Sequence, residues 1–355
     1  MSAVGEPLGV ATNTADDAGF AQFEEQRHTP LRRVQRALHR HPTVVPFVVL
    51  LLGVAAFSAI VGSRFLAPFN LSLILQQVTL VAMIGIAQTL VILTAGVDLS
   101  VGAIMILVTV ITGHFAVQFG MPTLPAVLIG LAIGMGCGAI NGALVTLVRL
   151  PPFIVTLGTW SIYGAIFLWY SGSQTIRAQD VTAAAPFLQL TGTAWSVYGA
   201  RFTLGTGVTI LTAVAMWYVL NRTAFGRHVY ATGDDAEAAR LAGINTRGVI
   251  LAIYTLAGLI CVLAAWVLIG RVGAISPNSG GTANLDSITA TVIGGTSLFG
   301  GRGSIVGTLV GALIVGVFRN GLALAGLDAL WQEFAVGVLI IVAVALDQWI
   351  RRVSA

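Results

Sequence analysis

Residues 127–145 read VLIGLAIGMGCGAINGALV and carry no charge. As an α-helix this run extends about 29 Å, which matches the roughly 30 Å hydrocarbon core of a bilayer. Within it, Gly130, Gly134, Gly138 and Gly142 recur at every fourth position and form a stripe without side chains along one face. Helices in lipid associate through close backbone packing at such stripes. The stretch therefore predicts a membrane-spanning helix that packs tightly against another helix.

The same glycine spacing recurs in a second apolar run, at Gly303, Gly307 and Gly311. Two roles are compatible with such stripes: static packing of one helix on another, or a face along which helices slide during transport. Either role predicts a compact bundle of helices.

The whole chain has the composition of an integral membrane protein. Of its 355 residues, 56% are apolar and 9% are charged, against roughly 25% charged in soluble domains. We expect an all-α polytopic bundle, because membrane β-strands are shorter and alternate in hydropathy. Segment 286–299 is short and contains Gly294 and Gly295, so we expect it to be broken or re-entrant. A spanning helix needs about 20 mainly apolar residues, and ten segments are candidates: 44–62, 71–93, 99–119, 124–148, 153–171, 202–220, 249–270, 286–299, 303–325 and 330–350.

The N-terminal end differs from this apolar transmembrane domain, which we place at residues 42–352. Residues 1–26 contain five acidic and no basic side chains, a composition typical of a disordered tail. Residues 27–41 contain five arginines at near-helical spacing, which favours a basic amphipathic helix on an anionic inner membrane surface. We therefore predict a separate cytoplasmic segment over residues 1–41.

The arginines predict the orientation in the membrane. All 18 basic residues are arginines. With ten spans and a cytoplasmic N-terminus, thirteen of them lie on the inner side and five near the outer side, as the positive-inside rule requires. Both termini are then cytoplasmic. This topology leaves two long polar stretches, one external over residues 172–201 and one cytoplasmic over residues 221–248.

Polar side chains inside the apolar segments are candidates for a translocation pathway. Asn70, Gln77 and Gln88 share nearly one face of the second segment. Unpaired amides are costly in hydrocarbon, so this face either lines a water-filled pathway or forms hydrogen bonds between helices. Asn141 and Thr156 are further candidates of the same kind.

The run TAGVDLSVGA, residues 94–103, is a polar break between two apolar runs. Asp98 and Ser100 stand where they can cap the helix that follows. Capping is sufficient to explain them, but transporters also place pathway residues at such breaks. A comparable break at residues 284–287 lies in the opposite half of the chain, and the two breaks suggest an internal repeat.

The cytoplasmic stretch contains GDDAEAARLAGI, residues 233–244. Asp234 and Glu237 have capping-box spacing, and Gly243 is a natural helix stop. Because Ala238 and Leu241 share one face with Ala242, we expect one short amphipathic helix. It is too short to cross a bilayer, so it either inserts into a groove on a partner or lies on the membrane surface.

Several kinds of chemistry lack their usual residues. The glycine run GGTSLFGGRGS, residues 294–304, lacks the lysine of a phosphate-binding loop. No HExxH motif and no grouping of serine, histidine and aspartate supports hydrolysis. Cys137 and Cys261 lie in apolar runs, which favours buried thiols over a disulfide or a metal site. We therefore expect a protein that is not an enzyme, holds no metal or cofactor, and takes its energy from a partner.

Several motifs together resemble the ribose, xylose and galactoside type permeases of bacterial ATP-binding-cassette sugar importers. They occur in order along the chain: GVDLSVGAIM (96–105), NGALV (141–145), PPFIVTLGTWSI (151–162), TAFGRHVYATG (223–233), EAARLAGI (237–244), LDSITATVIGGTSLFGGRGSIVGTLVGALI (285–314) and NGLALAG (320–326).

The resemblance implies a monosaccharide uptake system in the bacterial inner membrane that works by alternating access. Two permease copies would form the pathway, a cytoplasmic cassette ATPase pair would drive it, and an extracytoplasmic binding protein would deliver the sugar. The resemblance also matches Glu237, Ala238, Ala239 and Gly243 to the start of a loop whose short coupling helix enters a cleft on the ATPase. The Ile-x-Leu-Pro that follows in the general permease signature is absent after Gly243.

Two alternatives remain open. The first is a related permease for branched-chain amino acids or another small polar metabolite, because that branch shares motifs such as GGRGS. The second is a stand-alone secondary transporter. Association with a cassette ATPase, and loss of uptake when ATP is depleted while the ion gradient is kept, distinguish an importer subunit from a secondary transporter.

Overall fold

The computed structural model describes residues 44–280 and 283–351 of the chain, so the predicted tail and basic helix of residues 1–41 lie outside the described residues. The elements are α2 (Val44–Val61), η1 (Gly62–Arg64), α3 (Pro68–Leu93), α4 (Val101–Gly113), η2 (His114–Gln118), α5 (Thr123–Thr146), α6 (Pro152–Ser171), α7 (Ala178–Ala184), η3 (Pro186–Gly192), β1 (Ala194–Val197), β2 (Ala200–Thr203), α8 (Leu204–Arg222), α9 (Ala224–Asp234), α10 (Ala236–Leu241), α11 (Thr246–Val272), α12 (Ala283–Ile293), α13 (Ile305–Leu324) and α14 (Ala329–Arg351).

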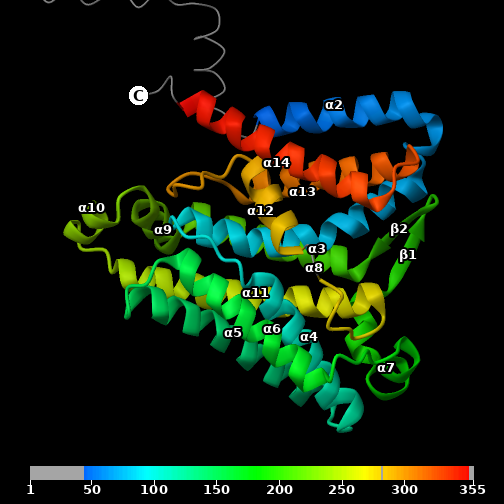
Figure 1. Ribbon diagram of the computed structural model, residues 1–355, viewed down its shortest axis with the longest axis horizontal. Helices are drawn as coiled ribbons and strands as arrows, with labels where there is room; N and C mark the ends of the chain where they lie inside the picture. The colour runs from blue at the N-terminus through cyan, green and yellow to red at the C-terminus, as the bar shows by residue number, and fades with distance from the viewer. Residues whose placement is uncertain (1–43, 281–282, 352–355) are drawn as a thin grey trace, which may run out of the picture.

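The long helices lie side by side as a bundle (Figure 1). Helices α9 and α10 lie at one end of it, at the left of Figure 1, and we call this the α10 end. The antiparallel hairpin of β1 and β2 lies at the other end together with α7, and we call this the hairpin end. The strand register pairs Ala194 with Thr203 and Val197 with Ala200.

The helices confirm the predicted all-α polytopic class. In the described residues, eight helices are long and apolar enough to cross a membrane, with α4 and η2 counted together. Each of the ten predicted segments coincides with a helix. Segment 286–299 corresponds to α12, whose 11 residues extend about 16 Å, roughly half the hydrocarbon core. This segment is therefore half a span.

Helix ends follow local rules of capping. Pro68 and Pro152 occupy first positions of α3 and α6, where the missing N–H costs nothing. Side-chain oxygens accept hydrogen bonds from main-chain N–H groups at the starts of α8, α9 and α13, where the caps are Thr203, Thr223 and Ser304. These polar caps separate apolar runs that would otherwise read as continuous helix.

The core of the bundle is formed mainly by α3, α4 and α11. Their buried side chains, such as Leu90, Met105 and Ile260, belong to one apolar cluster. The surrounding helices α2, α6 and α8 instead expose large apolar side chains such as Leu52, Ile154 and Leu211. An apolar outer surface of this kind suits contact with lipid.

The first glycine stripe packs α5 against α11. A Cβ at Gly138 would overlap the carbonyl oxygen of Tyr254, and a Cβ at Gly258 would overlap that of Gly134. Gly142 of α5 lies against Leu251 of α11. Gly130 instead faces α4, where a Cβ would overlap the hydroxyl of Thr112. Close main-chain approach thus requires glycine at these positions.

The second stripe is shorter than its spacing predicts. Gly307 and Gly311 pack against Gly294 and the carbonyl of Ala290, so they join α13 to α12. Gly303 does not belong to this helix, because Ser304 adopts an extended conformation and α13 begins only at Ile305. Including Gly303 in a helix-packing stripe was wrong, since its four-residue spacing crosses a helix cap.

The first predicted break is confirmed, whereas the second lies earlier than predicted, because residues 284–287 form the first turn of α12 and residues 273–280 are the non-helical ones. Helix α3 ends at Leu93, residues 94–100 are non-helical, and α4 is a helix of 13 residues. Helix α11 ends at Val272, and the half-length helix α12 follows after a non-helical segment. The main-chain carbonyl of Gln77 in α3 meets the guanidinium of Arg271 at the end of α11, so the two long helices are antiparallel. The internal repeat stays a prediction.

Candidate translocation pathway and coupling surface

The starts of α4 and of the half-length helix α12 meet inside the bundle. Asn284, at the second residue of α12, bridges them with its side-chain amide. Its Oδ1 accepts a 3.1 Å hydrogen bond from the main-chain nitrogen of Gly102, and its Nδ2 donates to the carbonyl oxygen of Leu99. Two helix N-termini that meet within a membrane bundle form a polar region in an otherwise apolar core.

Asp98 is buried next to this junction. Its Oδ1 accepts hydrogen bonds from the Ser100 hydroxyl at 2.6 Å and from the Ser100 main-chain nitrogen at 2.7 Å. The Ser100 hydroxyl in turn accepts from Nδ2 of Asn141 in α5, at 2.7 Å. Ser100 is the N-cap of α4 by position but its side chain makes no cap bond. The carboxylate of Asp98 therefore orders the start of α4, with Ser100 and Asn141 holding it in place.

Gln88 and Thr156 fix the main chain of the same break. The Gln88 amide is fully buried and lies against the main chain of Asp98. In the amide orientation that forms both hydrogen bonds, Nε2 lies 2.9 Å from the main-chain oxygen of Asp98 and Oε1 lies 3.2 Å from its main-chain nitrogen. Thr156 of α6 donates a 3.0 Å hydrogen bond to the carbonyl oxygen of Val97. The structure thus brings five of the predicted pathway residues to one non-helical segment, where they satisfy groups that the helix break leaves unpaired.

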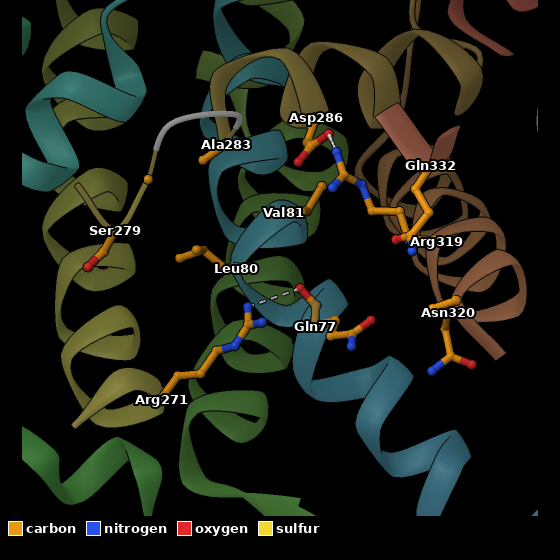
Figure 2. A pocket seen from close by; sticks show the side chains of 12 residues that line it. Gln77, Leu80, Val81, Arg271, Ser279, Ala283, Asp286, Arg319, Asn320 and Gln332 are labelled. Atoms are coloured by element: carbon orange, nitrogen blue, oxygen red, sulfur yellow. Dashed lines mark hydrogen bonds and ion pairs between the residues drawn. The ribbon is translucent and has the colours of Figure 1, made fainter. Parts of the chain in front are cut away.

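The remaining two predicted pathway residues lie apart from this cluster. Asn70 donates to the carbonyl oxygen of Phe65 at 2.8 Å and exchanges 3.0 Å hydrogen bonds with Asn320 of α13. Gln77 instead lines an open cavity near the hairpin end (Figure 2). The three amides that share one face of α3 therefore have different surroundings.

Three charged residues on the cavity wall were not among the predicted site residues: Arg271, Asp286 and Arg319. Asp286 in α12 and Arg319 in α13 form an ion pair with Nη2 and Oδ1 2.7 Å apart. Their position in apolar segments was the sequence signal that could have identified them, because charged side chains in such segments pair with one another or face water. Sequence reasoning counted these arginines only for orientation, so it missed the pair.

At the α10 end, the predicted single helix is two helices. Helix α9 ends at Asp234, and Asp235 caps α10 by accepting hydrogen bonds from the nitrogens of Glu237 and Ala238 at 2.9 and 3.0 Å. The prediction that Asp234 forms this cap was wrong by one residue, because Asp235 is the one with extended geometry. The predicted stop at Gly243 agrees with its φ of +86°, which suits glycine.

The surface of α10 is open to a partner. Leu241 is 78% exposed and Ala238 is also exposed, whereas Ala239 is buried. Glu237 and Arg240 form an exposed ion pair at 2.5 Å, and the hydrogen bond from Arg240 lowers the pKa of the Glu237 carboxyl below its ordinary value. The helix therefore displays a small apolar patch beside a fixed pair of opposite charges.

Helix α9 contacts the end of α3 and the segment after α12. Gly233 has no room for a Cβ because the carbonyl of Leu93 and the nitrogen of Gly301 lie against it. The nitrogen of Gly301 also donates to the carbonyl oxygen of Leu93 at 3.0 Å. The end of α3, the end of α9 and the segment after α12 thus meet through their main chains, directly beside α10.

Comparison with known proteins places this arrangement in a family. Residues 70–344 match the model of the family described as branched-chain amino acid transport system / permease component. This chain belongs to that permease family. The family match covers most of the described bundle, from α3 into α14, and it makes the chain a membrane transport component and not an enzyme.

The relatives include sugar import permeases. The fructose import permease protein FrcC of Rhizobium meliloti is 55% identical over 94% of this chain and 93% of its own. The ribose import permease protein RbsC of Bacillus subtilis is 38% identical over 85% and 92%, and the xylose transport system permease protein XylH of Escherichia coli is 30% identical over 84% and 89%. The resemblance that the motifs predicted is confirmed. No solved structure matches the chain.

Proposed function

We propose that this chain is the permease subunit of an ATP-driven monosaccharide importer, moved by a cytoplasmic ATPase through α10. The sugars named for its relatives support the substrate class. The observation that carries the coupling role is the main-chain junction of Leu93, Gly233 and Gly301 beside the exposed helix α10. Coupling between distant sites needs contiguous rigid elements of this kind.

The mechanism is alternating access. ATP binding draws together two ATPase subunits and, with them, the α10 helices of two permease copies. Helix α9 transmits this movement to the ends of α3 and to the segment after α12. Helix α4 and the half-length helix α12 are then repositioned against each other, which opens the pathway toward the hairpin end. A bound sugar would cross the membrane along the pathway that the two copies form together.

The α10 end is the cytoplasmic face in this proposal. Helices α8, α9, α10 and α11 place Arg222, Arg227, Arg240 and Arg247 at that end, as the positive-inside rule requires. Both termini are then cytoplasmic, and residues 1–41 precede the first span on the same side. The hairpin end faces an extracytoplasmic binding protein, to which it offers the exposed side chains of Trp195 and Tyr198. The second permease copy is identical to the first.

Reconstitution of the permease with its ATPase and binding protein in proteoliposomes tests the proposal. Labelled fructose, ribose and xylose are offered with ATP or with a non-hydrolysable analogue. We expect ATP-dependent uptake of at least one sugar, and at least tenfold slower uptake with Leu241→Asp, roughly the loss of one interface anchor. Full uptake by Leu241→Asp, or uptake driven by an ion gradient without ATP, would contradict the proposal.

The family description favours one alternative substrate class, branched-chain amino acids. The same vesicles distinguish it when labelled leucine is offered beside the sugars. Leucine uptake that exceeds uptake of every sugar would assign the chain to the amino-acid class, with the coupling role of α10 unchanged.

A further inference from the structure

A cavity of about 340 Å³ lies between α3, α11, α12, α13 and α14. Ligand pockets run from roughly 300 to 1,000 Å³, so this one has room for a small molecule. Figure 2 shows that its walls carry charged and amide side chains, with Arg271 reaching from α11 on one side and Arg319 from α13 on the other. Asp286 and Gln77 also line it. This composition is unusual inside a bundle whose outer helices are apolar.

Arg319 is held firmly at one wall. Its Nη2 lies 2.7 Å from Oδ1 of Asp286, and its Nη1 lies 3.0 Å from Oε1 of Glu333 in α14. The Asp286 side chain is 8% exposed and that of Arg319 is 24% exposed. Two carboxylates therefore fix the planar guanidinium, and rigid positioning is what a recognition site requires.

Arg271 is held loosely at the opposite wall. Arg271 is an exposed residue, and its guanidinium makes one long contact, 3.5 Å, with the main-chain carbonyl oxygen of Gln77. No carboxylate pairs with it among the described residues. Most of its five N–H donors thus remain available to a molecule in the cavity.

The charges define the ligand class. The charged residues that line the cavity are Arg271, Arg319 and Asp286. Glu333 lies outside the lining but pairs with Arg319, and with it the four formal charges sum to zero. A charged ligand would upset this balance, whereas a neutral molecule with many hydroxyl oxygens would accept hydrogen bonds from guanidinium and amide groups on both walls. The apolar lining is limited to side chains such as Leu80 and Val81, which gives a long aliphatic group little surface.

We propose that this cavity is a sugar-binding site within the permease, in which Arg271 and Arg319 donate hydrogen bonds to hydroxyl oxygens from opposite walls. The proposal rests on the proposed function and assigns it a location. An ion pair with a purely structural role would explain Asp286 and Arg319 but not Arg271, which faces the cavity without a carboxylate. The site lies toward the hairpin end, where sugar would enter from outside.

The test uses the complete importer in proteoliposomes with labelled fructose, ribose and xylose as probes. Arg271→Gln removes the charge and part of the guanidinium fork, and Arg64→Gln is the matched control because Arg64 is exposed at the same end but does not line the cavity. Two quantities are measured for each variant: ATP hydrolysis stimulated by the binding protein, and sugar uptake per ATP hydrolysed.

We expect Arg271→Gln to keep stimulated ATP hydrolysis within about twofold of the unmodified importer. Uptake per ATP should fall by about tenfold, because a charge-assisted hydrogen bond to the sugar is lost. The ratio of uptake among the three sugars should also change. Arg64→Gln should match the unmodified importer in both quantities. Arg271→Lys keeps the charge but not the planar guanidinium, so its uptake per ATP should lie between those of Arg271→Gln and Arg64→Gln. If Arg271→Gln fails to insert in the membrane, Arg271→Lys is tested by the same two quantities.

Three results would contradict the proposal that this cavity binds a sugar. One is unchanged uptake per ATP and unchanged sugar ratios in Arg271→Gln. Another is an equal loss in Arg64→Gln. The third is a parallel loss of ATP hydrolysis and uptake with unchanged ratios, which indicates a structural role. Failure of the unmodified importer to take up any of the three sugars would instead contradict the proposed function.

Discussion

The phenolic hydroxyl of Tyr230 in α9 donates a 2.9 Å hydrogen bond to the carbonyl oxygen of Gly303, between α12 and α13. Burial raises the pKa of this hydroxyl above its ordinary value of 10.0, so it remains a donor at neutral pH. The bond ties the helix beside α10 to the segment after α12, in addition to the main-chain contact at Gly233. These contacts support the connecting role that the proposed function gives to helix α9.

Removing this bond should weaken coupling. We expect Tyr230→Phe to assemble with the ATPase and to lower uptake roughly two- to tenfold, because a buried hydrogen bond contributes about 0.5–1.5 kcal/mol. Co-purification and uptake are measured together. Tyr218→Phe is the matched control, since Tyr218 of α8 is 57% exposed. Equal uptake by both variants would show that the Tyr230 bond plays no part in coupling.

Gly243 ends the turn after α10 and should not tolerate proline. Its φ is +86° and its nitrogen donates to the carbonyl oxygen of Arg240 at 3.0 Å. Proline fixes φ near −65° and has no N–H group, so Gly243→Pro should insert normally in the membrane but abolish uptake. Gly243→Asn accepts a positive φ and should retain most uptake. Normal uptake by the proline variant would refute the role of this turn.

Gln88 holds the main chain of Asp98, so its loss should impair transport more than assembly. In Gln88→Leu two buried main-chain groups lose their partner, at a cost of about 1–3 kcal/mol each. We expect lower uptake with normal co-purification of the ATPase. Gln174→Leu, at an exposed position, serves as the control. If Gln88→Leu transports at the normal rate, the geometry of this break does not limit transport.

The contact between α5 and α11 should depend on residue size at Gly138 but not at Gly136. Gly138 faces the main chain of Tyr254, whereas nothing lies within 4 Å of a Cβ at Gly136 on the same helix. Gly138→Val should destabilise the bundle by about 1–3 kcal/mol or more through overpacking. Thermal unfolding in detergent should show a lower Tm for Gly138→Val and little change for Gly136→Val. Equal Tm values would contradict the close approach.

The sequence predicted most of the helices because apolar length and composition decide whether a segment enters lipid. It also predicted the break at residues 94–100, since TAGVDLSVGA contains groups that hydrocarbon excludes. The second break was misplaced, because the polar residues 284–287 begin helix α12 and do not interrupt it. The cap at Asp235 was missed because adjacent aspartates have equal capping propensity, and main-chain geometry selects between them. Gly303 was misplaced because residue spacing does not reveal that Ser304 starts the helix.

The cavity could not be predicted from spacing within any one segment. Its arginines and Asp286 come from α11, α13 and α12, and only packing of these helices brings them to one space. Similarly, Asn70 and Gln77 share a face of α3, yet only Gln77 reaches the cavity, because Asn70 is paired with Asn320 of α13. Chain-distant neighbours decide what each polar side chain contacts.

The location of α10 tests the central claim most directly. A single cysteine is placed at Leu241, which is 78% exposed, or at Tyr198 of the hairpin turn, which is 96% exposed, in a chain with Cys137 and Cys261 replaced. A membrane-impermeant maleimide is then added to right-side-out or inverted vesicles. The account predicts that Leu241→Cys reacts only in inverted vesicles and is protected by the ATPase, whereas Tyr198→Cys reacts only in right-side-out vesicles. Reaction of Leu241→Cys in right-side-out vesicles, or no protection by the ATPase, would contradict it.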